Sequence, residues 1–167
     1  GSINTDSLYR IGGNAVLSVK GTSNTFAGVK SGLSNTTGNS NTALGFNSLY
    51  NNTAGNFNTA TGVDALFSNT TGTYNTGMGW HALRTNTLGT ANSALGEALE
   101  YNSTGSYNTG IGHGALYQNT TADANTAVGA FALLNNTTGH SNSAFGVDAM
   151  RNNTTGGQNT AYGVHAL

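Results

Sequence analysis

The feature that most constrains this sequence is a repeat of about 17 residues that covers most of the chain. Each unit reads approximately Asn-Thr-Ala-apolar-Gly-x-x-Ala-Leu-x-x-Asn-Thr-Thr-Gly-x-x, and we number its positions 1 to 17 from the first asparagine. Units of this kind stack on their neighbours to bury a continuous core, so each should form one turn of a repetitive structure. The nine units begin at Asn24, Asn41, Asn58, Asn75, Asn92, Asn108, Asn125, Asn142 and Asn159.

The unit is too short for a pair of helices, which needs about 33 residues or more. Positions 1 to 5 alternate small or polar residues with apolar ones, as strands do, and Asn-Thr-Thr-Gly is a turn signal. We therefore predict an all-β fold, a parallel β-solenoid or β-roll whose coils each hold two short strands and two turns. Residues 23–167 should form eight full coils and one partial coil, and residues 1–22 a tag remnant followed by a β-hairpin cap or neck around a glycine turn.

The fifth unit is one residue shorter than the others, because only Glu97 separates Gly96 from Ala98. The pattern resumes at once, which indicates a local defect that leaves the register of later coils intact. The alignment of the units places Glu97 in one column with Asp64 and Asp148, on a face exposed to solvent.

Stacking brings equivalent residues about 4.8 Å apart, so each unit position becomes a column along the solenoid. The uniform leucine and alanine columns should lie inside the coil. Position 4 is apolar but varies in size, which a fixed interior tolerates poorly, so we expect it to form a seam between subunits. The alternative is a second wall of the coil interior. The seam residues are Leu44, Met78, Leu95, Ile111, Val128, Phe145 and Tyr162.

The thin core expected of such a coil makes a lone chain marginal, since ordering each residue costs about 1–2 kcal/mol of backbone entropy. Assembly of several chains along the fibre axis would bury the second apolar column. The sequence therefore predicts an oligomer of identical chains.

Charged residues make up only 7% of the chain and the net charge is −1, too weak a field to favour nucleic acid. The chain has no cysteine, no apolar stretch long enough to cross a membrane and no histidines at metal-ligand spacing. We find no catalytic motif, and we expect no enzyme activity, cofactor, metal site or membrane insertion.

Aromatic residues occur in two variable columns, at positions 6 and 10, and position 10 also contains arginines. Exposed aromatic rings next to arginine can stack on sugars or anchor a protein partner, and the alternative is that they pack between subunits. The candidate ligand-binding residues are Trp80, Tyr50, Phe67, Arg84, Tyr117 and Arg151.

Segments such as Asn125-Thr126-Ala127-Val128-Gly129 resemble the repeats of YadA-like heads in trimeric autotransporter adhesins, and the longer unit is similar to repeats in bacterial and phage tail-fibre proteins. The resemblance covers residues 24–167. It implies a homotrimeric, left-handed β-roll, extracellular on a cell surface or virion fibre, that binds a glycan or protein receptor of a host or prey cell.

The function expected is that of a structural or adhesive fibre segment. One alternative is an ice-binding solenoid, because the threonines at position 13 form a regular array of hydroxyl and methyl groups. A second alternative is a passive spacer within a longer fibre.

Overall fold

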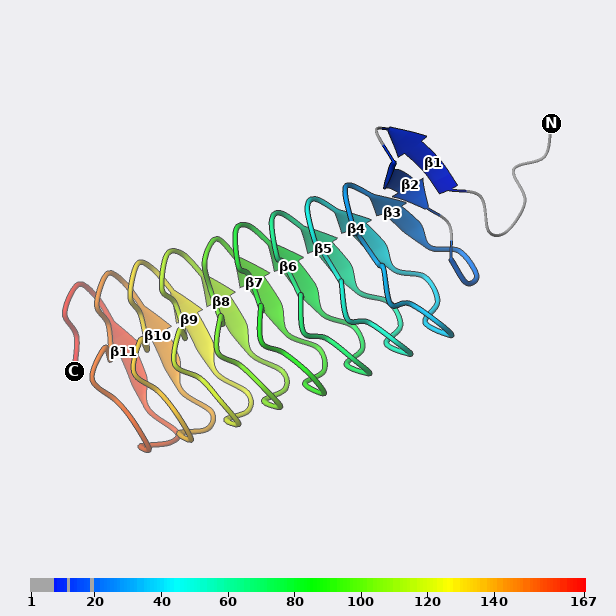
Figure 1. Ribbon diagram of the computed structural model, residues 1–167. Coiled ribbons are helices and arrows are strands. Elements are labelled where there is room, and N and C mark those ends of the chain that lie inside the picture. The colour runs from blue at the N-terminus through cyan, green and yellow to red at the C-terminus, as the bar shows by residue number, and fades with distance from the viewer. Residues whose placement is uncertain (1–7, 12, 19) are drawn as a thin grey trace.

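A computed structural model describes residues 8–11, 13–18 and 20–167, which form a single extended β structure with strands stacked along its length (Figure 1). One sheet contains all eleven strands in sequence order. The first two strands are β1 (Leu8–Ile11) and β2 (Asn14–Ser18). The repeat strands are β3 (Thr25–Ala27), β4 (Thr42–Leu44), β5 (Thr59–Thr61), β6 (Thr76–Met78), β7 (Ser93–Leu95), β8 (Thr109–Ile111), β9 (Thr126–Val128), β10 (Ser143–Phe145) and β11 (Thr160–Tyr162).

Strands β3 to β11 are parallel, and each residue pairs with the residue at the same unit position in the next coil. The register survives the short fifth unit, where Leu95 pairs with Ile111. The predicted fold class is therefore confirmed: the chain is an all-β parallel solenoid with coils of about 17 residues.

The prediction of two strands per coil is wrong, since each described coil holds one three-residue strand followed by consecutive turns. In the third coil the amide of Phe67 donates to the carbonyl of Asp64, and the amide of Asn69 donates to that of Leu66. Asp64 and Leu66 have φ angles of 55° and 52°, in the left-handed region. A leucine there costs about 1–2 kcal/mol, which its complete burial offsets.

The side of each coil that consists of turns is also hydrogen-bonded to the adjacent coils. The amide of Leu66 donates to the carbonyl of Ala82 at 3.0 Å, and the amide of Ser68 donates to that of Arg84 at 2.9 Å. Backbone hydrogen bonds thus run along both walls of the solenoid, although only one wall is a regular sheet.

The core is a single thin layer. The central residue of each repeat strand points inward and meets the leucine or methionine of position 9 and the small residue of position 8. The fully buried leucines are Leu49, Leu66, Leu83, Leu99, Leu116 and Leu133.

The first coil exchanges a small and a large residue. Phe26 stands at position 3, where most coils have alanine, and Gly32 stands at position 9, where they have leucine or methionine. A Cβ atom on Gly32 would lie 2.5 Å from Cδ2 of Phe26. The Phe26 ring therefore fills the space that leucine fills elsewhere, and the first coil keeps the same core with its two residues reversed.

Two buried asparagine columns fasten each coil to the next. At position 12, Nδ2 of Asn69 donates to Oδ1 of Asn52 at 2.8 Å and to the carbonyl of Gly72 at 3.0 Å. At position 1, the backbone amide of Asn75 donates to Oδ1 of Asn58, while Nδ2 of Asn75 donates to the carbonyl of Gly89. These bonds compensate the burial of polar groups in a core that has few large apolar side chains.

The glycines of position 5 allow adjacent backbones to approach closely. Gly79 has a φ of 137°, and a Cβ atom there would lie 2.7 Å from the carbonyl oxygen of Gly96 in the next coil. Both the dihedral and the contact require glycine at this position.

An antiparallel hairpin precedes the repeat. Strand β1 pairs with β2, and β2 pairs in turn with the edge of β3, where Leu17 lies opposite Ala27. The hairpin thus covers the first edge of the solenoid sheet (Figure 1), an edge that would otherwise expose unpaired backbone groups.

Candidate functional site

The proposed seam residues lie on the outer face of the sheet. Residues flanking the buried centre of each strand point outward, and Leu44, Leu95 and Tyr162 are 53%, 51% and 85% exposed. Met78 and Ile111 are also exposed, whereas Val128 and Phe145 are half-buried. Because position 4 points away from the core, it is not a second wall of the coil interior.

Three of the six candidate ligand-binding residues come together at position 10. The rings of Tyr50 and Phe67 stack with their centroids 5.1 Å apart, and the guanidinium carbon of Arg84 lies 6.0 Å from the centroid of the Phe67 ring. All three are half-buried, so these rings cover one another as well as facing solvent.

The other three candidates lie apart from that group. Trp80 is 54% exposed and stacks on the imidazole of His81, with centroids 3.6 Å apart. Arg151 lies over the ring of Phe131, and Tyr117 meets Tyr101 edge to face. The structure therefore divides the six residues among several places along the solenoid.

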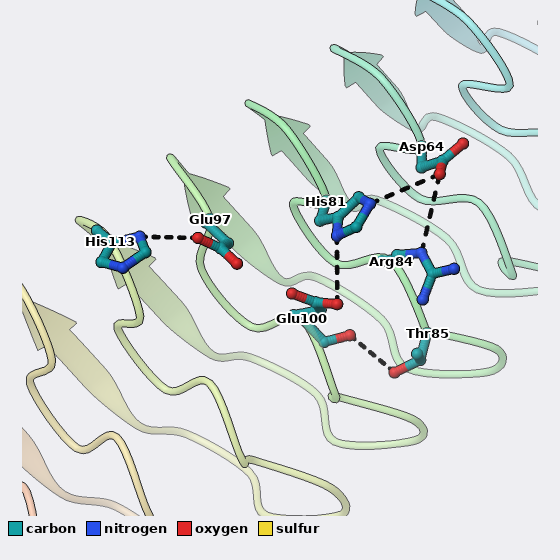
Figure 2. A network of polar contacts seen from close by, with 7 residues as sticks. All are labelled: Asp64, His81, Arg84, Thr85, Glu97, Glu100 and His113. Carbon is teal, nitrogen blue, oxygen red and sulfur yellow. Dashed lines mark hydrogen bonds and ion pairs between the residues drawn. The ribbon is translucent and has the colours of Figure 1, made fainter.

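A cluster of ionisable side chains joins three successive coils (Figure 2). His81 Nε2 lies 3.6 Å from Oδ2 of Asp64, and His81 Nδ1 lies 3.3 Å from Oε1 of Glu100. Arg84 Nε lies 3.9 Å from the same Asp64 oxygen. The backbone carbonyl of Glu100 accepts a hydrogen bond from the hydroxyl of Thr85 at 2.8 Å. Two carboxylates thus enclose one imidazole, one near each of its ring nitrogens.

The hydrogen bonding of this cluster is incomplete. His81 Nδ1, Arg84 Nε and Glu100 Oε2 are buried atoms without a hydrogen-bond partner, so the contact between His81 and Glu100 is electrostatic. Glu100 is only 4% exposed, which is unusual for a carboxylate. Burying these charged groups costs desolvation free energy that their contacts do not fully compensate. The cluster is therefore not explained by stability alone.

The short fifth coil lacks the residue of position 7. In the fourth coil the amide at position 7, of His81, donates to the carbonyl at position 6 of the coil before it, Val63. The amide of Gly114 makes the equivalent bond to the carbonyl of Glu97, so Glu97 occupies position 6. The alignment of Glu97 with Asp64 and Asp148 was therefore wrong by one position.

A second pair of a carboxylate and an imidazole lies beside the first cluster. Oε2 of Glu97 is 2.8 Å from Nδ1 of His113, as Figure 2 shows. Burial, a side-chain hydrogen bond with Tyr101 and the charges of Glu100 and Glu97 raise the pKa of Tyr117 to about 12. The potential around the Tyr117 hydroxyl is consequently negative.

Sequence reasoning did not identify Asp64, His81 and Glu100 as a group. Asp64 and His81 share position 7 in adjacent coils, but the alignment treated that column as separate solvated charges. Position 7 lies at a turn and position 10 three residues later, so their side chains converge around one edge. The available signal was the presence of several ionisable residues in three consecutive units of a chain otherwise poor in charge.

Within the part of the chain that the structure describes, no set of three histidine, cysteine or acidic side chains is arranged to hold a metal ion. The same residues include no helix that is long and apolar enough to cross a membrane. Comparison of the chain with protein-family models, with curated proteins and with solved structures found no match.

Proposed function

We propose that this chain is a non-enzymatic segment of an extracellular fibre, in which three copies of a left-handed solenoid assemble side by side and the trimer binds, or presents a binder for, the surface of another cell. The single observation that carries the proposal is the exposed apolar column at position 4 of the sheet. A mainly apolar exposed strip of this kind, here interrupted by Thr61, marks a surface that is covered in the working molecule.

The outer face of the sheet suits contact with a second copy. Its two outward columns consist of threonine or serine at position 2 and mainly apolar residues at position 4, without a single charged residue between Thr25 and Tyr162. Covering this face would therefore require no charge to be desolvated and no matching charge on the partner. Because every copy of the chain carries the same face, identical chains can cover it for one another.

The thin core supports the same conclusion. Each full coil buries one large apolar side chain beside small residues, and most coils also bury two asparagines. Covering position 4 would add a second apolar layer along the whole solenoid, at about 25 cal/mol for each Å² of apolar surface removed from water.

Light scattering of the purified chain tests the assembly, with an expected mass of three times 16.9 kDa. Leu95→Asp, in the middle of the position-4 column, should dissociate the trimer because it would bury a charge. Leu88→Asp is the matched control, because Leu88 is equally exposed, at 55%, but stands at position 14. A wild-type mass of one chain, or equal dissociation by both substitutions, contradicts the proposed trimer.

The hydrogen bonds that the threonine hydroxyls donate argue against the ice-binding alternative. At position 13, Oγ1 of Thr53 donates to the carbonyl of Thr70 and Oγ1 of Thr70 donates to that of Thr87. These hydroxyls are bound within the solenoid, so they do not form a free array. A thermal hysteresis measurement should show no activity, and binding to intact cells separates an adhesive segment from a passive spacer.

A further inference from the structure

Two adjacent coils lack a side chain at position 7. Every other coil places one there, including Asp64, His81 and Phe131, each with a φ between 55° and 60°. The fifth coil has lost the residue, and the sixth has Gly114. Because coils are about 4.8 Å apart, the edge between His81 and Phe131 has a notch about two coils long.

The notch forms a hollow of about 180 Å³ in the surface of the solenoid. Phe131 leans over the glycine, since a Cβ atom on Gly114 would lie 2.7 Å from Cδ1 of its ring. The hollow therefore combines aromatic and aliphatic walls with one polar pair. Its lining residues are Glu97, His113, Gly114, Tyr117, Phe131 and Leu134.

The polar groups of the notch are suited to hydroxyl groups. The Glu97 carboxylate can accept hydrogen bonds from them, and the His113 imidazole can donate or accept. His113 is exposed, with 61% of its side chain accessible, so its contact with Glu97 can be exchanged for contacts with a ligand.

The charges of the notch discriminate between ligands. No lysine or arginine lines it, and Arg151, which lies over the Phe131 ring, is paired with Asp148 at 2.9 Å. Glu97 and Glu100 both act on the Tyr117 hydroxyl. A carboxylate or sulfate on a ligand would therefore be repelled. A ring with apolar C–H faces and neutral hydroxyl groups would pack on the aromatic walls while its hydroxyls meet Glu97.

We propose that the notch between the fifth and seventh coils is a binding subsite for a single neutral or amino-substituted saccharide ring. The proposal rests on the proposed adhesive function, because it names the chemistry that such a fibre segment would recognise. The subsite lies within one chain, at the turn edge that follows position 5, and so it does not depend on the position-4 seam.

Saturation-transfer NMR with the methyl glycosides of glucose, galactose, mannose, N-acetylglucosamine and glucosamine tests the proposal directly. At least one should bind wild-type protein at millimolar concentrations, and sialyllactose should compete no better than any of them. Failure of all five, or stronger binding of sialyllactose, overturns the proposal. Stronger binding of n-butylammonium than of every sugar overturns it in favour of a cation site.

Substitutions then test whether the ligand binds in the notch. Tyr117→Leu and Glu97→Gln should each weaken binding at least about tenfold, by removing an aromatic wall and a charged acceptor. Gly114→Asn should abolish binding, because its Cβ would meet Cδ1 of Phe131 at 2.7 Å and push that ring into the notch. Asn47 shows that asparagine adopts the conformation of position 7, with a φ of 54°.

Tyr74→Leu and Asp123→Asn are matched controls, because they make the same kinds of change at exposed positions outside the notch and should leave affinity unchanged. Circular dichroism verifies that each variant is folded. Equal affinity of wild-type protein, Glu97→Gln and Tyr117→Leu overturns the assignment of the notch. Light scattering on the same samples keeps the two proposals apart, since a single chain that binds a glycoside contradicts the trimer alone.

Discussion

The reversed pair in the first coil permits a sharp test of how the core specifies the solenoid. Phe26 is 1% exposed, and its ring lies against the glycine that replaces the usual leucine. Phe26→Ala should leave a cavity and cost about 3–5 kcal/mol. Gly32→Leu should also destabilise, by about 1–3 kcal/mol, because the new side chain meets the ring.

The double variant Phe26→Ala with Gly32→Leu recreates the arrangement of the third coil, where Ala60 and Leu66 fill the same positions. Its backbone is compatible, since Gly32 has a φ of 57° and Leu66 one of 52°. We therefore expect stability within about 1 kcal/mol of wild type. Because the two single costs sum to about 4–8 kcal/mol, the coupling energy between the substitutions should be at least about 3 kcal/mol.

Hydrogen exchange gives the readout, because a terminal coil can open without the rest of a repeat array. The amide of Thr25 donates to the carbonyl of Asn41 in the next coil, and its protection should fall roughly a hundredfold or more in Phe26→Ala and return in the double variant. Amides of β10 serve as an internal reference, and Phe57→Ala, which removes an exposed ring, as a control. Additive effects of the two substitutions would refute the reasoning that one residue fills the space of the other.

Three further outcomes are expected. Gly79→Ala should prevent folding or cost about 3 kcal/mol or more, because its Cβ would lie 2.7 Å from the Gly96 carbonyl oxygen, and thermal unfolding monitored by circular dichroism measures this. Asn69→Leu should cost about 2–4 kcal/mol, since it leaves Oδ1 of buried Asn52 without the donor it has now, whereas Ser68→Ala beside it should change the unfolding free energy little. An absorbance titration should show Tyr117 ionising near pH 12, and that step should vanish in Tyr117→Phe. Because its pKa is raised above the unfolded value of 10.0, stability should be retained below that pH and decline as the pH rises toward 12.

The repeat period was sufficient to predict the solenoid, because a strand register follows directly from identical residues recurring at equal intervals. It did not distinguish a second strand from a series of turns. Leu66 and its equivalents are buried leucines with positive φ, and propensity alone gives no reason to place leucine there. The contacts between stacked coils account for it, because the leucine that fills the core in most coils holds the backbone in the conformation that its position requires.

The candidate site was less predictable for a related reason. Exposed aromatic residues at position 10 were identified from their column, yet their contacts depend on which neighbour each ring meets, as with Arg84 over Phe67. The misplacement of Glu97 shows the limit most clearly. A one-residue deletion can be aligned in two ways, and only the hydrogen bond from Gly114 to Glu97 settles which position is missing.

A uniform solenoid offers few places for selective chemistry, because each column repeats the same environment along its length. Selectivity requires a coil that differs from its neighbours, and here the differences converge on one edge. The fifth coil lacks position 7, the sixth has Gly114 there, and Glu100 brings a buried carboxylate to position 10 of the coil with the deletion. If the deletion had no function, the positions around it should carry the same residue types as in the other coils. The carboxylates and glycine gathered around this deletion are what the two proposals require: regular columns for the proposed assembly and an irregular edge for the proposed recognition.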